Sequence, residues 1–276
     1  IYTVKDTLSL HDALPILYQQ LAEREINSVD DAQQFLLDFS ELGAVLAEEG
    51  ALRRIAQSCH TDDKDIEQRF LHWIENISPK TDPWETKLQQ KLLDSPYAQQ
   101  LDQDRFGVML KQWRADVELF RAENIPLFVE VTKLNKRYDQ IVGGMEIDFR
   151  GKTRTIQQMM PFLEDTERDT REQAWRLISD ERLAHRAAFD GLFDQILEKR
   201  HKVAANAAMD NCRDYVWKSY KRFDYTPDDC LAFGDAVASR IVPLLTRVQE
   251  RRKASLELET LRPWDLYAST TGDESP

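Results

Sequence analysis

Apolar residues recur every three or four positions along most of this sequence, which is the spacing of amphipathic helices. In one segment Ser28 precedes the apolar run and Asp31 follows three residues later, a pattern that favours a helix start. That run contains Val29, Ala32, Leu36, Phe39 and Leu46. A second run contains Ile66, Phe70, Trp73 and Ile77 and is expected to stop at Pro79. Both segments are predicted to be helical.

Prolines and glycines mark the expected ends of the helices. Pro83 suits the first position of a helix, where the missing backbone N–H costs nothing. An apolar pattern that reaches residue 141 ends at Gly143-Gly144, a strong stop signal. The longest helix candidate covers roughly 168 to 208. Thr226-Pro227 starts the last helix, and Pro243 should kink it.

One stretch shows the alternation of a β-hairpin. Polar and apolar residues alternate over 146–150, Gly151-Lys152 is expected to form the turn, and alternation returns over 153–156. Only 9 glycines and 10 prolines occur in 276 residues, and no other run of alternating β-branched residues is present. The sequence therefore predicts an all-α fold with a single β-hairpin near 146–156.

Charge and cysteine content narrow the function classes. The 37 Lys and Arg residues against 49 Asp and Glu residues give a formal net charge of −12. So acidic a surface repels phosphate backbones and anionic lipid, which argues against nucleic acid and membrane partners. No apolar run approaches the roughly 20 residues that span a bilayer. The three dispersed cysteines, Cys59, Cys212 and Cys230, indicate no disulfide framework, so a cytoplasmic location is predicted.

Residues 1–16 are predicted to be a non-native leader. The chain starts with Ile1, and the stretch Thr7–Ile16 resembles a translated sequencing-adaptor tract. Lys5, Asp6, His11 and Asp12 interrupt the apolar stretch that a secretory signal needs. A short ordinary helix is the alternative interpretation of this segment.

Candidate metal ligands are sparse. Glu198 and His201 have the Glu-x-x-His spacing of di-iron bundles, but no second such pair exists, so a solvated helix face is favoured. His185 is expected to be hydrogen-bonded at the edge of the core. The acidic groups within 62–67 and 164–169 lack the glycine and glutamate of a calcium loop and are interpreted as helix caps. No catalytic, cofactor-binding or metal-binding residue is assigned.

An aromatic block follows the long helix candidate. Five aromatic residues fall within eleven positions: Tyr215, Trp217, Tyr220, Phe223 and Tyr225. Basic residues between them could suggest a stacking surface for single-stranded nucleic acid. Aspartates in the same twenty residues cancel that positive charge, so a connector that docks its aromatic rings between helices is favoured.

The ordered series of segments resembles the oligoendopeptidase F and thimet oligopeptidase family of zinc metallopeptidases. The similar segments are Asp38–Glu49, Phe120–Leu127, Glu167–Trp175, Asn211–Cys230 and Leu261–Asp265. The resemblance implies a helical N-terminal lobe of a two-lobed metallopeptidase whose groove admits short peptides. In that family zinc is held by His-Glu-x-x-His and a later glutamate. None of the five histidines here precedes a glutamate, so this motif is absent.

The resemblance therefore implies a fragment of a zinc-dependent oligoendopeptidase that is cut before its active site. Residues 17–200 would form the N-terminal helical region, and residues 201–276 would begin the peptidase domain. Zinc and oligopeptide substrates would belong to the full-length protein, while this chain alone would bind no zinc and be inactive. The alternative is a non-catalytic helical binding or scaffold protein.

The missing catalytic region would then be the packing partner of this chain. A helix near the cut should consequently expose its apolar residues, namely Val237, Ile241, Leu244, Leu245 and Val248.

Overall fold

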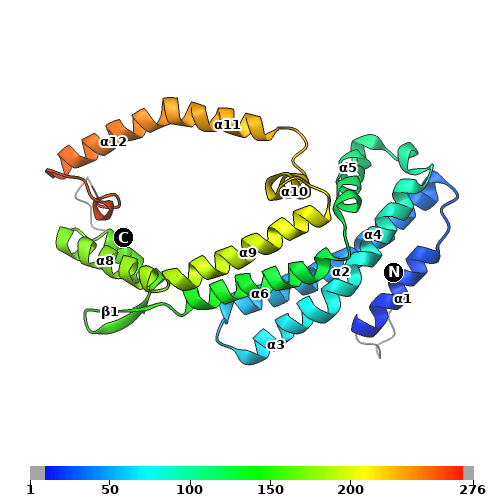
Figure 1. The fold of residues 1–276 in the computed structure, drawn as a ribbon, viewed down its shortest axis with the longest axis horizontal. Helices are drawn as coiled ribbons and strands as arrows, with labels where there is room; N and C mark the ends of the chain where they lie inside the picture. Colours follow the sequence, from blue (N-terminus) through cyan, green and yellow to red (C-terminus); the bar gives the residue numbers. More distant parts are fainter. Residues whose placement is uncertain (1–9, 270–276) are drawn as a thin grey trace. The chain divides into compact units, whose positions relative to one another are not determined.

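A computed structural model describes residues 10–269, with side chains from residue 14. The fold is all-α with one small hairpin, as predicted (Figure 1). Two compact units divide the chain, the first comprising residues 1–139 and 194–222, the second 140–193 and 223–276. Among the described residues, no helix is both long and apolar enough to cross a bilayer.

The first unit is a bundle of helices. Its elements are α1 (Leu10–Glu23), α2 (Val29–Cys59), α3 (Lys64–His72), α4 (Ser78–Asp94), α5 (Gln103–Leu119), most of α6 (Asn124–Gly143), the C-terminal part of α9 (Arg186–Asn206) and α10 (Cys212–Ser219). Ser28 caps α2 by accepting a hydrogen bond from the Asp31 N–H, as its sequence predicts. An apolar core lies among α1, α2, α4 and α5 and contains the fully buried side chains Tyr18, Phe35, Leu88, Leu92 and Leu110.

Polar contacts link helices within the first unit. Asn124 is buried at the start of α6 and donates to the Val203 carbonyl, 3.1 Å away on α9. Asn206 donates in turn to Asn124 Oδ1 at 2.7 Å. The Lys136 ammonium on α6 binds the Glu67 carboxylate on α3. These bonds satisfy buried polar groups and link α6 to α9 and to α3.

The second unit contains the hairpin and the helices around it. Strands β1 (Glu146–Phe149) and β2 (Lys152–Thr155) pair antiparallel, with Glu146 opposite Thr155. They are followed by α7 (Ile156–Met159), α8 (Arg168–Ala184) and the first residues of α9. Met145, Ile147, Phe149, Met159, Ala174 and Ile178 form its core. Helices α11 (Pro227–Ala236) and α12 (Val242–Ser255) complete the unit.

Two predicted helix boundaries were wrong. The apolar stripe does not stop at Pro79, because a π-helical turn, Trp73–Ile77, joins α3 to α4, and Pro79 lies in the first turn of α4. Pro83 lies inside α4 rather than at its start. Only one backbone hydrogen bond is lost at Pro83. Fully buried Leu88 and Leu92 hold α4 in the core, so tertiary packing outweighs that loss.

The helix predicted over 168–208 is instead divided at His185. The His185 N–H donates to the Arg182 carbonyl at 3.2 Å, an i→i−3 bond that tightens the end of α8 before α9 begins. The hairpin turn is also displaced by one residue, because Arg150 and Gly151 both have positive φ and Lys152 already belongs to β2. Two such residues in succession are typical of a type I′ turn.

Other predicted boundaries are confirmed. α6 ends at Gly143, and Thr226 forms a capping box with Asp229 at the start of α11. The run expected to kink at Pro243 contains a π-helical turn, Val237–Ile241, immediately before α12. The predicted boundary at residue 200 stays a prediction. The predicted leader lies partly outside the described residues; from Leu10 onward it belongs to α1, and Leu14 is buried.

Candidate functional site

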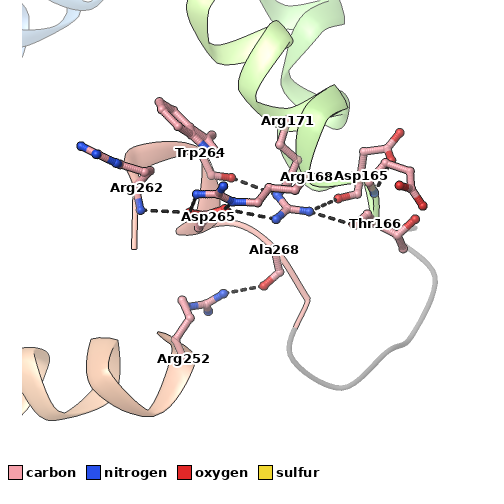
Figure 2. A network of polar contacts seen from close by, with 10 residues as sticks. Asp165, Thr166, Arg168, Arg171, Arg252, Arg262, Trp264, Asp265 and Ala268 are labelled. Carbon is pink, nitrogen blue, oxygen red and sulfur yellow. Dashed lines mark hydrogen bonds and ion pairs between the residues drawn. The ribbon is translucent and has the colours of Figure 1, made fainter. Parts of the chain in front are cut away.

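A buried carboxylate organises the C-terminal part of the second unit. Asp265 is fully buried just beyond α12 and accepts hydrogen bonds from two arginines of α8 (Figure 2). Arg168 binds it with both Nε, at 3.0 Å, and Nη2, at 2.9 Å. Arg171 Nη2 lies 3.2 Å from it, and the backbone N–H of Arg262 donates at 2.9 Å. Such a bidentate arginine contact fixes orientation as well as distance.

Arg171 also donates hydrogen bonds to backbone carbonyls of two segments that are distant in sequence. Its side chain is only 4% exposed and donates to the carbonyls of Trp264 at 3.0 Å, Asp165 at 2.8 Å and Thr166 at 3.0 Å (Figure 2). The Trp264 ring packs on Trp175 of α8 with ring centroids 5.4 Å apart. The segment after α12 is therefore anchored to the start of α8.

The electrostatics of this network indicate a structural anchor. Burial alone would raise the pKa of Asp265, but the hydrogen bonds from Arg168, the Arg262 N–H and Arg171 outweigh it and hold the pKa below the usual range. A carboxylate of this kind stays ionised and engaged, so it is unsuited to exchanging protons with a substrate.

The aromatic block lies across the boundary between the two units. In α10, Lys218 binds Glu118 and the following Lys221 binds Asp116, which ties this connector to α5. The Arg222 guanidinium lies over the Trp217 ring, 4.8 Å from its centroid. Tyr215, Trp217 and Phe223 are half-buried, whereas Tyr220 and Tyr225 are exposed. The basic side chains Lys218, Lys221 and Arg222 thus contact carboxylates or an aromatic ring, and the docking of the aromatic rings between helices stays a prediction.

Glu198 and His201, the pair with the Glu-x-x-His spacing, do not belong to a cluster of metal ligands. Glu198 and His201 are both exposed on α9, and His185 lies 3.2 Å from its neighbour Glu181. Throughout the part of the chain that the structure describes, no three His, Cys, Asp or Glu side chains gather closely enough to hold a metal ion. A zinc site with three protein ligands does not fit these residues.

The helices from Pro227 to Ser255 bury no residue. Figure 1 shows α11 and α12 following each other as one run. The large apolar side chains exposed there are Leu231, Phe233, Ile241, Val242, Leu244, Leu245 and Val248. Four of the five residues predicted to be exposed belong to this set, and the fifth, Val237, is half-buried. An apolar face of this extent is typical of a surface that packs against another body.

A second group of polar residues, which was not predicted from the sequence, lies in the first unit. Gln57 on α2 is 3% exposed and Asp82 on α4 is half-buried, and both line one cavity. Gln57 stands eleven residues after Leu46, which is three helical turns along the apolar stripe of α2. A polar residue at a position where the helical pattern of α2 expects an apolar one was the signal that could have identified Gln57.

Comparisons with known proteins agree on one family. Residues 9–120 match the peptidase M3 N-terminal domain, and residues 162–275 match peptidase family M3. No curated protein matches the chain.

Solved structures share the fold. One, assigned as an oligoendopeptidase F from Bacillus anthracis str. Ames, superposes with a TM-score of 0.86 at 22% identity, covering 96% of this chain and 49% of that one. A PZ peptidase A with an inhibitor gives 0.87 at 21% identity, covering 92% and 45%. The oligoendopeptidase F from Enterococcus faecium gives 0.64 at 16% identity, covering 95% and 56%. The chain thus spans about half the length of these relatives.

Proposed function

Because the chain belongs to peptidase family M3, we propose that it forms the N-terminal helical part of a zinc-dependent oligoendopeptidase. The substrates would be short peptides, hydrolysed at internal peptide bonds. The observation that carries the proposal is the pair of M3 matches, one near each end of the chain, on a fold shared with oligoendopeptidase structures.

Zinc and its general base are proposed to come from polypeptide outside these 276 residues. His60, His72 and His201 are exposed and separated, and no zinc-binding cluster is found among the described side chains. The 276-residue chain is therefore proposed to bind no stoichiometric zinc and to cleave no oligopeptide by itself. Exposed Cys59 and Cys230, with no disulfide, suit the reducing cytoplasm that we propose for it.

The remaining part of the peptidase is proposed to cover the apolar face of α11 and α12. Two observations support this partner. That face buries no residue in this chain, and the solved relatives are about twice as long as the chain. A peptidase domain that packs there would remove Leu244, Leu245 and their neighbours from water, a favourable change of about 25 cal/mol per Å² of apolar surface.

The test is to express the 276-residue chain beside the product of the complete reading frame. Bound zinc would be measured by elemental analysis, and activity by cleavage of a quenched fluorescent peptide. We expect zinc and chelator-sensitive cleavage from the long form only. Peptide cleavage by the purified 276-residue chain would overturn the proposal that zinc and its general base lie outside it. A complete reading frame without His-Glu-x-x-His would favour the alternative of a non-catalytic helical scaffold.

A further inference from the structure

A cavity of about 430 Å³ lies inside the first unit, between α2, α3, α4 and α6. Its size is within the range of small-molecule sites. Its apolar walls are formed by Phe70, Trp73, Ile74, Ile125, Phe128 and Val129. The peptidase proposal above makes no use of this cavity.

One wall carries an unsatisfied donor. Gln57 is 3% exposed and lines the cavity, and its Nε2 has no hydrogen-bond partner. A buried polar group without a partner costs about 1–3 kcal/mol. A ligand atom that accepts a hydrogen bond from Nε2 would remove that cost, so Gln57 points to an occupant with an oxygen or nitrogen acceptor.

A second part of the cavity lining carries a carboxylate without a partner. Asp82 on α4 lines this cavity and two neighbouring hollows, and its side chain makes no hydrogen bond or ion pair with any described residue. Glu85, one turn later, differs because Tyr18 donates a hydrogen bond to it at 3.1 Å. Burial, with a smaller contribution from the Glu85 charge, raises the pKa of Asp82 to about 6. A nearby cation would reverse that shift.

Two carboxylates and two cations line the cavity, and one of the two cations is already paired. On α6, Lys136 is already bound to Glu67, and burial raises the pKa of Asp139. On α2, Arg54 is exposed and forms no ion pair with a described residue. The cavity lining therefore holds two carboxylates and one guanidinium without an ion pair, in a chain whose formal net charge is −12. The carboxylate of Asp82, which has no ion-pair partner, would attract a cation.

We propose that this cavity is a binding site for an organic cation, namely a protonated amine or a guanidinium on an apolar stem. The cation pairs with Asp82, the stem packs on the ring of Trp73, and an acceptor atom of the ligand receives the Gln57 Nε2–H. The same chemistry is present in a free small amine and in a basic residue of a peptide, and the experiment separates these two sources.

Isothermal titration calorimetry on the 276-residue chain tests the site. Tyramine is the free-amine probe, and its isostere tyrosol lacks the charge. A capped Ala-Arg-Ala peptide is the peptide probe, with citrulline in place of arginine as its neutral control. We expect at least one cationic probe to bind with a one-to-one ratio, about tenfold or more tightly than its neutral isostere. Binding by tyramine alone assigns the site to small amines, and binding by the peptide alone assigns it to peptides.

The pH dependence provides an independent readout on the unmodified chain. Since the pKa of Asp82 is about 6 without ligand, its carboxylate is mostly ionised at neutral pH and mostly protonated at pH 5. Affinity for the cation should therefore fall about tenfold between about pH 7.5 and about pH 5.

Variants locate the binding to Asp82. Asp82→Asn keeps the shape and removes a charge whose burial is unfavourable, so it should fold normally and lose about tenfold or more in affinity. Asp94→Asn, an exposed aspartate at the end of the same helix, is the matched control and should bind as the unmodified chain does. Arg54→Ala should strengthen binding by removing a competing cation. Equal binding of tyramine and tyrosol, unchanged affinity in Asp82→Asn, or no binding by either cationic probe would each overturn the proposal.

Discussion

Replacing Asp265 by alanine should release the segment after α12 from α8. Asp265 is 0% exposed and accepts two hydrogen bonds from Arg168, one from Arg171 and one from the backbone of Arg262. Without the carboxylate, Arg171, which is 4% exposed, keeps its positive charge in a buried position. That uncompensated charge is the main source of the expected loss.

The expected magnitude follows from what each arginine retains. Removing one partner of a buried ion pair typically costs about 3–5 kcal/mol. Arg171 keeps three backbone carbonyl acceptors, and Arg168 is 39% exposed, so water can replace part of its lost contact. Both effects lower the cost, and about 3 kcal/mol is expected for opening the anchored segment.

Hydrogen exchange followed by mass spectrometry measures this local opening. A loss of about 3 kcal/mol corresponds to a fall of about a hundredfold in protection of the amides around 262–269. Asp190→Ala is the matched control, because Asp190 pairs with Arg186 on an exposed face at 3.4 Å. Exposed pairs contribute about 0.2–1 kcal/mol, so this variant should leave that protection unchanged. If Asp265→Ala retained the protection seen in Asp190→Ala, the anchoring role would be refuted.

Acid should weaken the same anchor. The pKa of Asp265 in the folded chain is held below its ordinary value near 3.8, so the unfolded chain binds the proton more tightly. The contribution of Asp265 to stability is therefore complete above about pH 4 and is lost as the pH falls further. In Asp265→Ala this part of the acid dependence should be missing, which urea unfolding curves at several pH values would reveal.

Two further substitutions test the hairpin and the exposed helices. Gly151 has φ +73°, so Gly151→Val should destabilise the turn by roughly 1–2 kcal/mol. The control is Gly43→Val, at a position with open space, which should lack this turn strain. Equal loss of hairpin protection in hydrogen exchange by both variants would contradict the turn assignment. Leu245 is 53% exposed, so Leu245→Glu should leave the urea unfolding midpoint unchanged and reduce the binding of a hydrophobic dye. A large fall in the midpoint would mean that the apolar face of α11 and α12 is buried in this chain.

Much of the helical architecture could be predicted because its signals are local. Ser28 reaches the Asp31 N–H three residues away, and Thr226 and Asp229 satisfy each other across the same interval. The hairpin register depends on two residues with positive φ between two short alternating segments. Contacts of this kind join residues only a few positions apart, so the same residues can form them whatever the rest of the fold is.

The resemblance to the oligoendopeptidase F family also came from the sequence, and the matches to peptidase family M3 confirm it. The absence of His-Glu-x-x-His could be read directly from the five histidines. The exposure of Ile241, Leu244, Leu245 and Val248 was inferred from the missing catalytic motif, and the structure places these side chains in solvent.

Other features were decided by tertiary structure alone. The local sequence around Pro83 predicts a helix start, but α4 continues through Pro83 because Leu88 and Leu92 are buried in the core. Asp265 meets Arg168 across 97 residues, and Gln57 and Asp82 share a cavity only because α2 and α4 pack together. A sequence shows which side chains can ionise or donate. Which of them lose their water and which partner replaces it depends on segments that only folding brings together.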